Sequence, residues 1–223
     1  MERIRHAIFD LDGTLVDSLP GIEWSIQAAL ARCGLPPLSR DLRPLIGPPI
    51  RRILAAVSGV REPERLDRLE YAFRSSYDSG GWRRTRLQAG AAELLEQLRD
   101  GGIGLWVVTN KPARATRRIL EGLQLAGLFE EIRCRDSRTP AFGSKAEVLV
   151  DLLRRRALTP SACLMIGDTA EDSEAAMAAG IDCAIVADGY GVDTPLPAGS
   201  KRVSGWDEIA ELCAVALCAG ERC

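Results

Sequence analysis

Five short runs of mostly apolar residues constrain the fold of this chain more than any other feature of its sequence. Stretches of about ten to fifteen residues with helical spacing separate the last four of these runs. Strands that alternate with helices in this way are typical of a parallel sheet with helices on both faces, so we expect an α/β fold. The predicted strands are residues 6–9, 103–109, 129–134, 162–166 and 182–186.

The helical stretches begin and end at residues that are typical of helix termini. Gly101 follows a leucine-rich stretch, and Pro112 precedes the next helical pattern. Ser144 and Glu147 have the spacing of a capping box, in which each side chain bonds a backbone N–H group near the start of the helix. A last helix is predicted over residues 206–217.

The chain between the first and second predicted strands is too long for one helical crossover. From residue 20 to about residue 80, apolar residues follow helical spacing and no strand pattern interrupts them. We therefore predict a small helical bundle that is inserted after the first strand and stands at the C-terminal edge of the sheet. The predicted domains are a core of residues 1–17 and 82–223 and a helical insertion of residues 18–81.

Charge and hydropathy exclude several kinds of partner. The 29 basic and 31 acidic residues give a net charge of −2, so we expect no nucleic-acid partner. No run approaches the roughly 18 apolar residues of a membrane span, and the first residues lack the apolar stretch of a signal peptide. The seven cysteines form no CxxC pair. We therefore expect no membrane partner, free thiols and a cytoplasmic location.

The counts of histidine and lysine limit the chemistry. The single histidine, His6, excludes Ser-His-Asp triads and most zinc sites unless His6 itself takes part. Acid–base chemistry must therefore use carboxylates or lysine. Only three lysines occur, so the place of each one is informative: Lys111, Lys145 and Lys201.

Polar residues gather where the predicted strands end. The first strand is followed by DLDGT at residues 10–14, the second ends in TNK at 109–111, and the fourth is followed by GDTAED at 167–172. Lys145 begins the helix after the third strand. Because ligand sites in open parallel sheets lie at the carboxyl ends of the strands, we expect these side chains to meet at one site.

Four aspartates at this site would repel one another unless a cation neutralised them, and a site made of oxygen ligands suits Mg²⁺. They are Asp10, Asp12, Asp168 and Asp172. Bound Mg²⁺ usually keeps waters and shares a substrate phosphate. Asp10 could then attack phosphorus as a carboxylate nucleophile, while Asp12 protonates the leaving oxygen and later activates water.

The phosphoryl oxygens also need groups that offset their negative charge. Thr109, Lys145 and the backbone amides of the loop after Asp12 are candidates for that role.

With DLDGT at 10–14, VVTN at 107–110, Lys145 and GDTAED at 167–172, the chain resembles the haloacid dehalogenase (HAD) superfamily of phosphohydrolases over its whole length. This resemblance implies a Rossmann-like parallel sheet as the α/β hydrolase core. It also implies that the insertion of residues 18–81 is a helical cap, which closes over the site and sets the choice of substrate.

The resemblance implies a role for each motif residue. The nucleophile is Asp10 and the acid–base group is Asp12. The phosphate or substrate is bound by Gly13, Thr109, Asn110 and Lys145, of which Thr109 and Lys145 are also counted as catalytic. The ligands of Mg²⁺ are Asp10, the backbone carbonyl of Asp12, Asp168 and, directly or through water, Asp172.

Smaller features narrow the activity within the superfamily. The dehalogenases lack a second carboxylate like Asp12, and Thr14 favours phosphatases over the sugar phosphomutases. Residues 46–51 and 109–112 resemble phosphoglycolate phosphatases, although Ala146 stands where those enzymes commonly carry proline. A similar Lys-Ala-Glu pattern occurs among nucleotidases. We expect a phosphoglycolate phosphatase-like enzyme, with a nucleoside 5'-monophosphatase or a sugar phosphatase as the alternatives.

Each motif residue alone also has a purely structural explanation. Asp172 lies three residues after Thr169 and fits the acidic half of a capping box, and an isolated Lys145 would be a solvated helix residue. The occurrence of all these motifs together, in this order along the chain, favours a functional site over the separate structural explanations. Receiver domains gather similar groups but lack the insertion. A non-catalytic regulatory module of the same fold remains an alternative.

The expected partner is a small phosphorylated metabolite, and the sequence leaves monomer and homodimer open.

Overall fold

The computed structural model describes residues 3–191, 195–197 and 200–218, with side chains as far as Cys213. The chain divides into two compact units. Unit 1 consists of Met1–Val16 with Leu87–Cys223, and unit 2 of Asp17–Arg86. Within the described ranges, no helix is long and apolar enough to cross a membrane.

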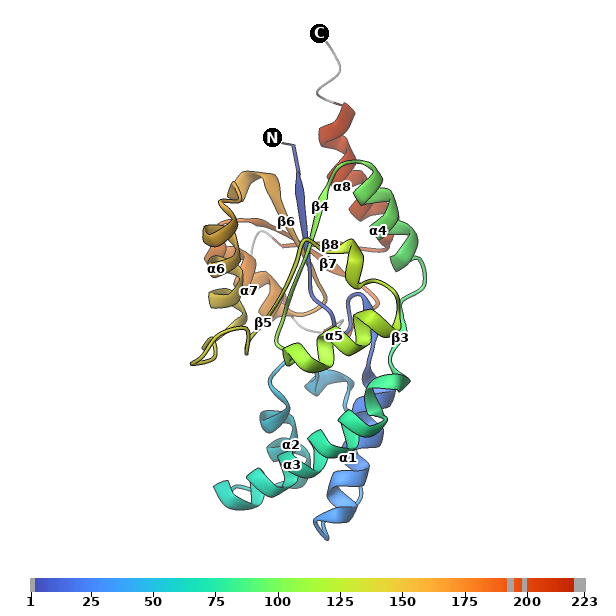
Figure 1. Cartoon of the computed structure of the whole chain (residues 1–223), viewed down its shortest axis with the longest axis vertical. Coiled ribbons are helices and arrows are strands. Elements are labelled where there is room, and N and C mark those ends of the chain that lie inside the picture. The colour runs from blue at the N-terminus through green and yellow to red at the C-terminus, as the bar shows by residue number, and fades with distance from the viewer. Residues whose placement is uncertain (1–2, 192–194, 198–199, 219–223) are drawn as a thin grey trace. The chain divides into compact units, whose positions relative to one another are not determined.

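Unit 1 is built on a six-stranded sheet in which all strands are parallel, in the order β5-β4-β1-β6-β7-β8 (Figure 1). The strands are β1 (His6–Phe9), β4 (Gly104–Thr109), β5 (Glu131–Cys134), β6 (Cys163–Gly167), β7 (Asp182–Val186) and β8 (Ser200–Val203). The predicted α/β fold is therefore confirmed, and the five predicted strands are all present.

The edge strand β8 was not predicted. Its four residues, Ser-Lys-Arg-Val, contain one buried apolar side chain, Val203, while Lys201 and Arg202 are exposed. Strand prediction from sequence depends on apolar runs or alternation, and this segment has neither. It pairs with β7 through the backbone.

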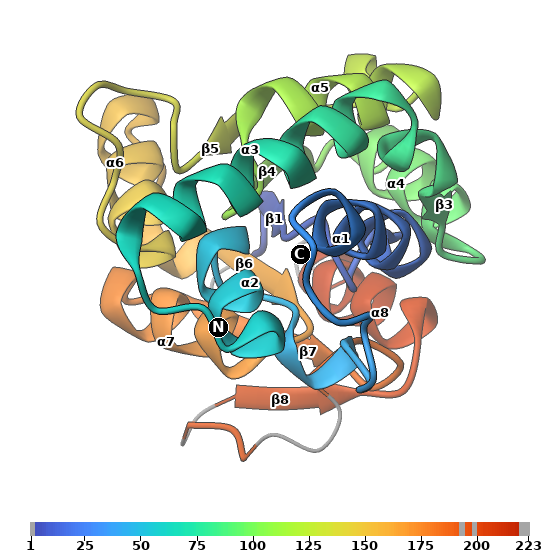
Figure 2. The ribbon, with the colours of Figure 1, turned by 90° about the horizontal axis from the view of Figure 1, so that it is seen from below.

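Helices cover both faces of the sheet. They are α4 (Ala91–Asp100), α5 (Ala113–Gly122), α6 (Lys145–Arg156), α7 (Ala170–Ala179) and α8 (Trp206–Cys218). Helices α6 and α7 pack together on one face, and α4 and α8 pack together on the other (Figure 2). Val148 and Leu152 of α6 belong to a buried cluster with Ile8 of β1 and Met165 of β6. The motif loops therefore start from a rigid core.

The predicted helix ends are largely confirmed. Gly101 follows α4 as its C-cap, and Pro112 precedes α5 as its N-cap. Only half of the predicted capping box of α6 forms: Ser144 Oγ accepts from the N–H of Glu147 at 3.2 Å. The Glu147 carboxylate reaches one residue further back and accepts from the N–H of Gly143 at 3.0 Å.

Unit 2 is helical, as the spacing of its apolar residues predicts. It contains α1 (Leu19–Arg32), α2 (Ile50–Ser58) and α3 (Pro63–Ser79), with short 3-10 turns at Arg43–Leu45 and Gly81–Arg84. Helix α3 packs against both α1 and α2. Where the chain passes between the units, β2 (Val16–Asp17) and β3 (Arg86–Leu87) form a two-stranded sheet.

A close backbone approach explains one glycine of α1. A Cβ atom at Gly21 would lie 2.2 Å from the carbonyl oxygen of Gly81, so a larger residue there would push the turn at Gly81–Arg84 away from α1.

The cysteines whose side chains are described are free thiols, as expected: Cys33, Cys134, Cys163, Cys183 and Cys213. The side chains of Cys218 and Cys223 lie outside the described part of the chain.

Candidate active site

The predicted motif residues come together at the carboxyl ends of the central strands of unit 1. Strand β1 lies between β4 and β6, so the loops that follow these three strands are neighbours. Asp10 follows β1, Thr109 ends β4, and Asp168 follows β6. Lys145 is the first residue of α6, and its ammonium group reaches Asp10. The sheet topology therefore gathers residues that are far apart in the sequence.

Three buried aspartates surround one buried lysine. Asp10, Asp168 and Asp172 each offer a carboxylate oxygen, and these three atoms lie within 4.8 Å of one another. The Lys145 Nζ atom lies 3.1 Å from Asp10 Oδ1 and 2.7 Å from Asp172 Oδ1. When all four groups are ionised, three carboxylates and one ammonium leave a net charge of −2, which a divalent cation would neutralise.

Burial and like charge change the protonation of this cluster. Burial, opposed by Lys145, raises the pKa of Asp10 from 3.8 to about 7. Burial also raises the pKa of Asp168 well above its ordinary value, and the charges of Asp172 and Asp10 add to the rise. Burial disfavours the charged form of Lys145, but the facing carboxylates outweigh this effect and raise its pKa. The cluster therefore retains protons that a cation would displace.

The donor set of this cluster fits a hard divalent cation. All donors are carboxylate oxygens, which Mg²⁺ and similar ions prefer. The Asp10 Oδ1 atom is buried and accepts no hydrogen bond from the described part of the chain, although it faces the Lys145 ammonium group. A lone pair of this oxygen is therefore available to a metal ion.

Two neighbouring loops hold Asp168 in place. Thr14, in the loop after β1, donates its hydroxyl to Asp168 Oδ1 at 3.2 Å. The backbone N–H of Tyr190, in the loop after β7, donates to Asp168 Oδ2 at 2.7 Å. Each oxygen keeps a further lone pair, so these bonds orient the carboxylate without excluding a metal ion.

Asp172 both caps a helix and belongs to the acidic cluster. Its Oδ2 atom accepts from the N–H groups of Asp168 and Thr169, at 3.2 and 3.1 Å, and from the Thr169 hydroxyl at 2.9 Å. Its Oδ1 atom pairs with Lys145. One oxygen of Asp172 therefore caps α7, while the other faces Lys145 within the acidic cluster, and its role as a metal ligand stays a prediction.

Two glycines make room for the Asp168 side chain, and a third makes room for its backbone. A Cβ atom at Gly13 or at Gly189 would lie 2.1 Å from an Asp168 side-chain atom, and one at Gly191 would lie 2.5 Å from the Asp168 carbonyl oxygen. Gly13 also has a φ of +86°, a left-handed conformation that side chains with a Cβ atom disfavour. The position of Asp168 therefore depends on the absence of these Cβ atoms.

Gly13→Ala is expected to damage the candidate metal site more than the strain of one residue explains. Its new Cβ atom forces Asp168 to move, in addition to about 1–2 kcal/mol of left-handed strain. We expect at least a tenfold loss of Mg²⁺ affinity, measured by titration calorimetry. Gly102→Ala is the matched control, because Gly102 has a φ of +78° and open space around it. Equal metal affinity in the two variants would contradict this account of Gly13.

The raised pKa of Asp10 predicts how the stability of the metal-free protein depends on pH. The folded state holds the Asp10 proton up to a pKa of about 7, and the unfolded state releases it near 3.8, so stability falls as pH rises between these values. Asp10→Asn removes this loss. In urea with EDTA, the variant's gain in unfolding free energy over wild type should grow from pH 5 to about pH 7 and then level off. A gain that is independent of pH would contradict the shift.

Thr109 presents its hydroxyl for donation. The side chain is 1% exposed, and its Oγ1 atom accepts from the N–H of Lys111 at 3.2 Å. Because that bond uses a lone pair, the hydroxyl hydrogen is left to donate to another acceptor, such as a phosphoryl oxygen. Asn110 lies between these two residues with a partly buried side chain, and its predicted binding role stays a prediction.

Asp12 is held by Lys111, a lysine that the sequence places at a strand end but to which it assigns no role. The Lys111 Nζ atom lies 2.9 Å from Asp12 Oδ1 and 3.0 Å from Asp12 Oδ2. The side chains of Lys111 and Asp12 are 6% and 16% exposed. The third lysine, Lys201, makes a surface contact of 3.9 Å with Glu208.

Sequence reasoning missed three of the residues that shape this site. Lys111 was placed with Thr109 and Asn110 at the end of its strand, but its pairing with Asp12 was not predicted. Thr14 was used only to separate enzyme classes, although it bonds Asp168. Tyr190 contributes a backbone N–H group, which leaves no signal in the identity of its side chain.

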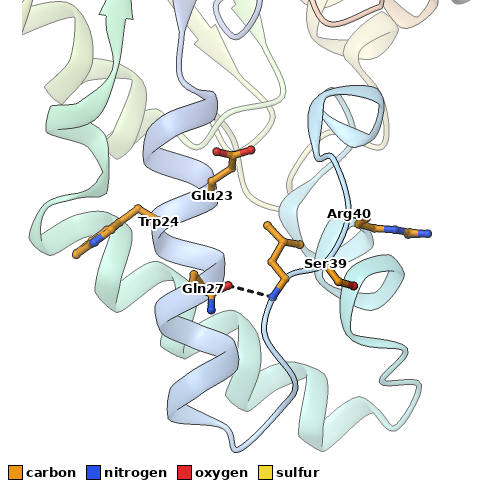
Figure 3. Close-up of a pocket in the computed structure, with 6 residues that line it drawn as sticks. Glu23, Trp24, Gln27, Ser39 and Arg40 are labelled. Atoms are coloured by element: carbon orange, nitrogen blue, oxygen red, sulfur yellow. Dashed lines mark hydrogen bonds between the residues drawn. The ribbon is translucent and has the colours of Figure 1, made fainter.

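A separate open pocket lies within unit 2, between α1 and the loop at residues 38–40 (Figure 3). The Gln27 side chain of α1 accepts a hydrogen bond from the N–H of Leu38 at 3.0 Å, which connects the helix to the loop on the other side of the pocket. The volume is about 530 Å³ and the lining residues are Glu23, Trp24, Gln27, Leu38, Ser39 and Arg40. Its only carboxylate is Glu23, so it lacks the acidic cluster of unit 1.

Comparison with known proteins gives one family over most of the chain. The family model described as haloacid dehalogenase-like hydrolase matches residues 7–186. Two relatives from Pseudomonas aeruginosa carry phosphatase names. A 5'-nucleotidase is 34% identical over 201 residues, 88% of each chain. Phosphoglycolate phosphatase 1 is 31% identical over 200 residues, which cover 86% of this chain and 72% of that protein.

Another relative has a different name. The tyrosine-protein kinase PtkA of Mycobacterium tuberculosis is 37% identical over 185 residues. The match covers 82% of this chain but only 62% of the kinase, so this chain spans less than two thirds of that protein's length. The solved structure of PtkA matches with a TM-score of 0.82 and 34% identity, over 96% of this chain and 99% of the solved chain.

Proposed function

Because this chain belongs to the haloacid dehalogenase-like hydrolase family, we propose that it is a Mg²⁺-dependent phosphatase that hydrolyses a small phosphate monoester through an aspartyl-phosphate intermediate. The observation that carries this proposal is the buried cluster of Asp10, Asp168 and Asp172 around Lys145. The cluster puts a carboxylate nucleophile next to a candidate cation site and a positive charge.

In the first step, an oxygen of the Asp10 carboxylate attacks phosphorus and the bond between phosphorus and the ester oxygen breaks. The ester oxygen leaves as an alcohol with a proton from Asp12. In the second step, a water molecule attacks the phosphorus of the aspartyl-phosphate and gives a proton to Asp12. The bond between Asp10 and phosphorus then breaks, inorganic phosphate leaves, and both carboxyl groups regain their starting state.

Positive and donor groups of unit 1 would stabilise the transferred phosphoryl group. We assign this role to the hydroxyl of Thr109, the ammonium of Lys145 and the side chain of Asn110. The predicted part of Gly13 is not kept, because its backbone N–H already donates to the carbonyl oxygen of Val16 at 2.8 Å. Asp10, Asp168, the carbonyl of Asp12 and, directly or through water, Asp172 would hold Mg²⁺, whose charge would offset that of the negative phosphoryl oxygens.

Unit 2 is proposed as the cap that selects the substrate and excludes bulk water from the reaction. We propose a phosphoglycolate-like monoester as the substrate, because residues 46–51 and 109–112 resemble phosphoglycolate phosphatases and a relative of that name matches most of the chain. A nucleoside 5'-monophosphate is the alternative, supported by the 5'-nucleotidase relative. The partner in either case is a small phosphorylated metabolite.

The relative named as a tyrosine kinase raises a different possibility, transfer of phosphate to a protein. Hydrolysis is favoured by Asp12, because a carboxylate two residues from the nucleophile serves an attacking water. A kinase would instead need to protect its phosphoryl group from water.

The test is phosphate release from a panel of monoesters with Mg²⁺ and with EDTA. The panel contains phosphoglycolate, sugar phosphates, nucleoside monophosphates, and ATP with a tyrosine peptide. Release that needs Mg²⁺ and is fastest with phosphoglycolate is the expected result. Preference for nucleotides or sugars would keep the mechanism and change the substrate. Transfer to the peptide without hydrolysis would contradict it, and no reaction with any member would favour the non-catalytic module.

A further inference from the structure

Each carboxylate of the DLD segment has its own lysine. Asp10 faces Lys145, which Asp172 also contacts. Asp12 faces Lys111, whose ammonium group contacts both of its oxygens. The second pair is separated by 99 positions in the sequence and joins the loops after the neighbouring strands β1 and β4.

Lys111 is itself held firmly by its backbone. Its N–H donates to Thr109 Oγ1 at 3.2 Å, and its carbonyl oxygen accepts from the buried hydroxyl of Thr116 at 3.5 Å. Thr116 lies on α5, which packs beside β5. These bonds anchor the backbone of Lys111, and its side chain is 6% exposed, so burial restricts the ammonium that contacts the more exposed Asp12 side chain.

On the proposed function, Asp12 must stand where it can give a proton to the ester oxygen. We propose that Lys111 is a positioning residue that holds the Asp12 carboxyl group in that place. An unpaired aspartate on a loop turns freely about two side-chain bonds, whereas two contacts with a buried ammonium fix its direction. When Asp12 carries a proton, one oxygen still accepts from Lys111 and the other presents the proton.

This role differs from that of Lys145. Lys145 lies among the acidic residues of the candidate cation site, and its contacts are with Asp10 and Asp172. The ammonium of Lys111 instead contacts both carboxylate oxygens of Asp12. A lysine that acts only by positioning the proton donor should affect the rate of the first chemical step only when the leaving group needs a proton.

The experiment compares two esters that differ in this need. The kcat/KM value covers the steps up to release of the alcohol, so it isolates the first chemical step. The leaving group of an alkyl phosphate is a strongly basic alkoxide, which needs a proton from an acid. The leaving group of p-nitrophenyl phosphate is a weakly basic phenolate, which departs without one. We expect Lys111→Met to lower kcat/KM about 10–100-fold for the alkyl ester and less than about threefold for the aryl ester.

Three further variants complete the test. Asp12→Asn should also lower kcat/KM more for the alkyl ester than for the aryl ester, and by larger factors than Lys111→Met. Lys111→Met in the Asp12→Asn background should add no further loss, because the residue it positions is already gone. Lys201→Met is the matched control and should equal wild type. Melting temperatures with Mg²⁺ establish that each variant is folded, and the double variant leaves neither partner of the ion pair unpaired.

Other outcomes overturn the proposal in distinguishable ways. Equal losses on both esters, or a further loss in the Asp12→Asn background, would mean that Lys111 contacts the phosphoryl group or only supports the fold. A gain in kcat/KM would mean that Lys111 restrains Asp12. If Asp12→Asn showed no dependence on the ester, or wild type hydrolysed neither ester, the proposed function itself would be wrong.

Discussion

Asp10→Asn is expected to abolish phosphate release and, in the same protein, to stabilise the metal-free fold. Loss of the nucleophile removes the covalent step, and we expect the rate to fall by about 10⁴-fold or more. The substitution also removes one of three mutually repelling buried carboxylates and keeps the pair between Lys145 and Asp172. The expected gain in unfolding free energy is about 1–3 kcal/mol.

Two measurements check this result, phosphate release with Mg²⁺ and urea unfolding with EDTA at pH 7. Asp182→Asn is the matched control, because Asp182 is exposed at the start of β7 and lies outside the acidic cluster. Release near the wild-type rate would contradict the role of Asp10 as nucleophile. Unfolding free energy equal to that of the control would contradict the charge repulsion inferred for the cluster.

Lys145→Met is expected to have the opposite effect on stability and also to remove activity. Methionine keeps much of the length of the side chain but leaves Asp10, Asp168 and Asp172 without the ammonium. Breaking a buried ion pair by removing one partner costs about 3–5 kcal/mol. We therefore expect the metal-free variant to melt far below wild type, and Mg²⁺ to raise its melting temperature by more than it raises that of wild type.

Thermal melts with EDTA and with Mg²⁺ test this prediction, and Lys201→Met serves as the control because its contact lies on the surface. A Lys145→Met protein that melts at the wild-type temperature in EDTA would show that the ammonium does not hold the acidic cluster together. The two variants form a pair, because Asp10→Asn lowers the net negative charge of the cluster and Lys145→Met raises it.

Much of the fold could be predicted because its signals are local. Apolar runs such as the one at residues 162–166 and helical spacing in unit 2 depend on neighbours in the sequence. Strand β8 was not predicted, because an edge strand with exposed Lys201 and Arg202 buries too few apolar side chains to leave a pattern in the sequence. Its place is set by backbone pairing with β7, which the sequence does not display.

The candidate site also contains residues that the sequence predicted and contacts that it did not. The order of the DLDGT and GDTAED segments and of Lys145 predicted which residues would meet, because the carboxyl ends of parallel strands share an edge. Partners such as Lys111 for Asp12 and the Tyr190 amide for Asp168 depend on side-chain reach and loop path across long sequence separations. No spacing rule contains that information.

The measurement that tests the central claim most directly is the mass of the enzyme during turnover. Wild-type protein is mixed with Mg²⁺ and substrate, quenched in acid within milliseconds, and digested for mass spectrometry. The account predicts an added phosphoryl group on the peptide that contains Asp10, at the aspartate itself, and none in Asp10→Asn. Rapid hydrolysis with no phosphoryl group on Asp10, or one on another residue, would contradict the proposed mechanism.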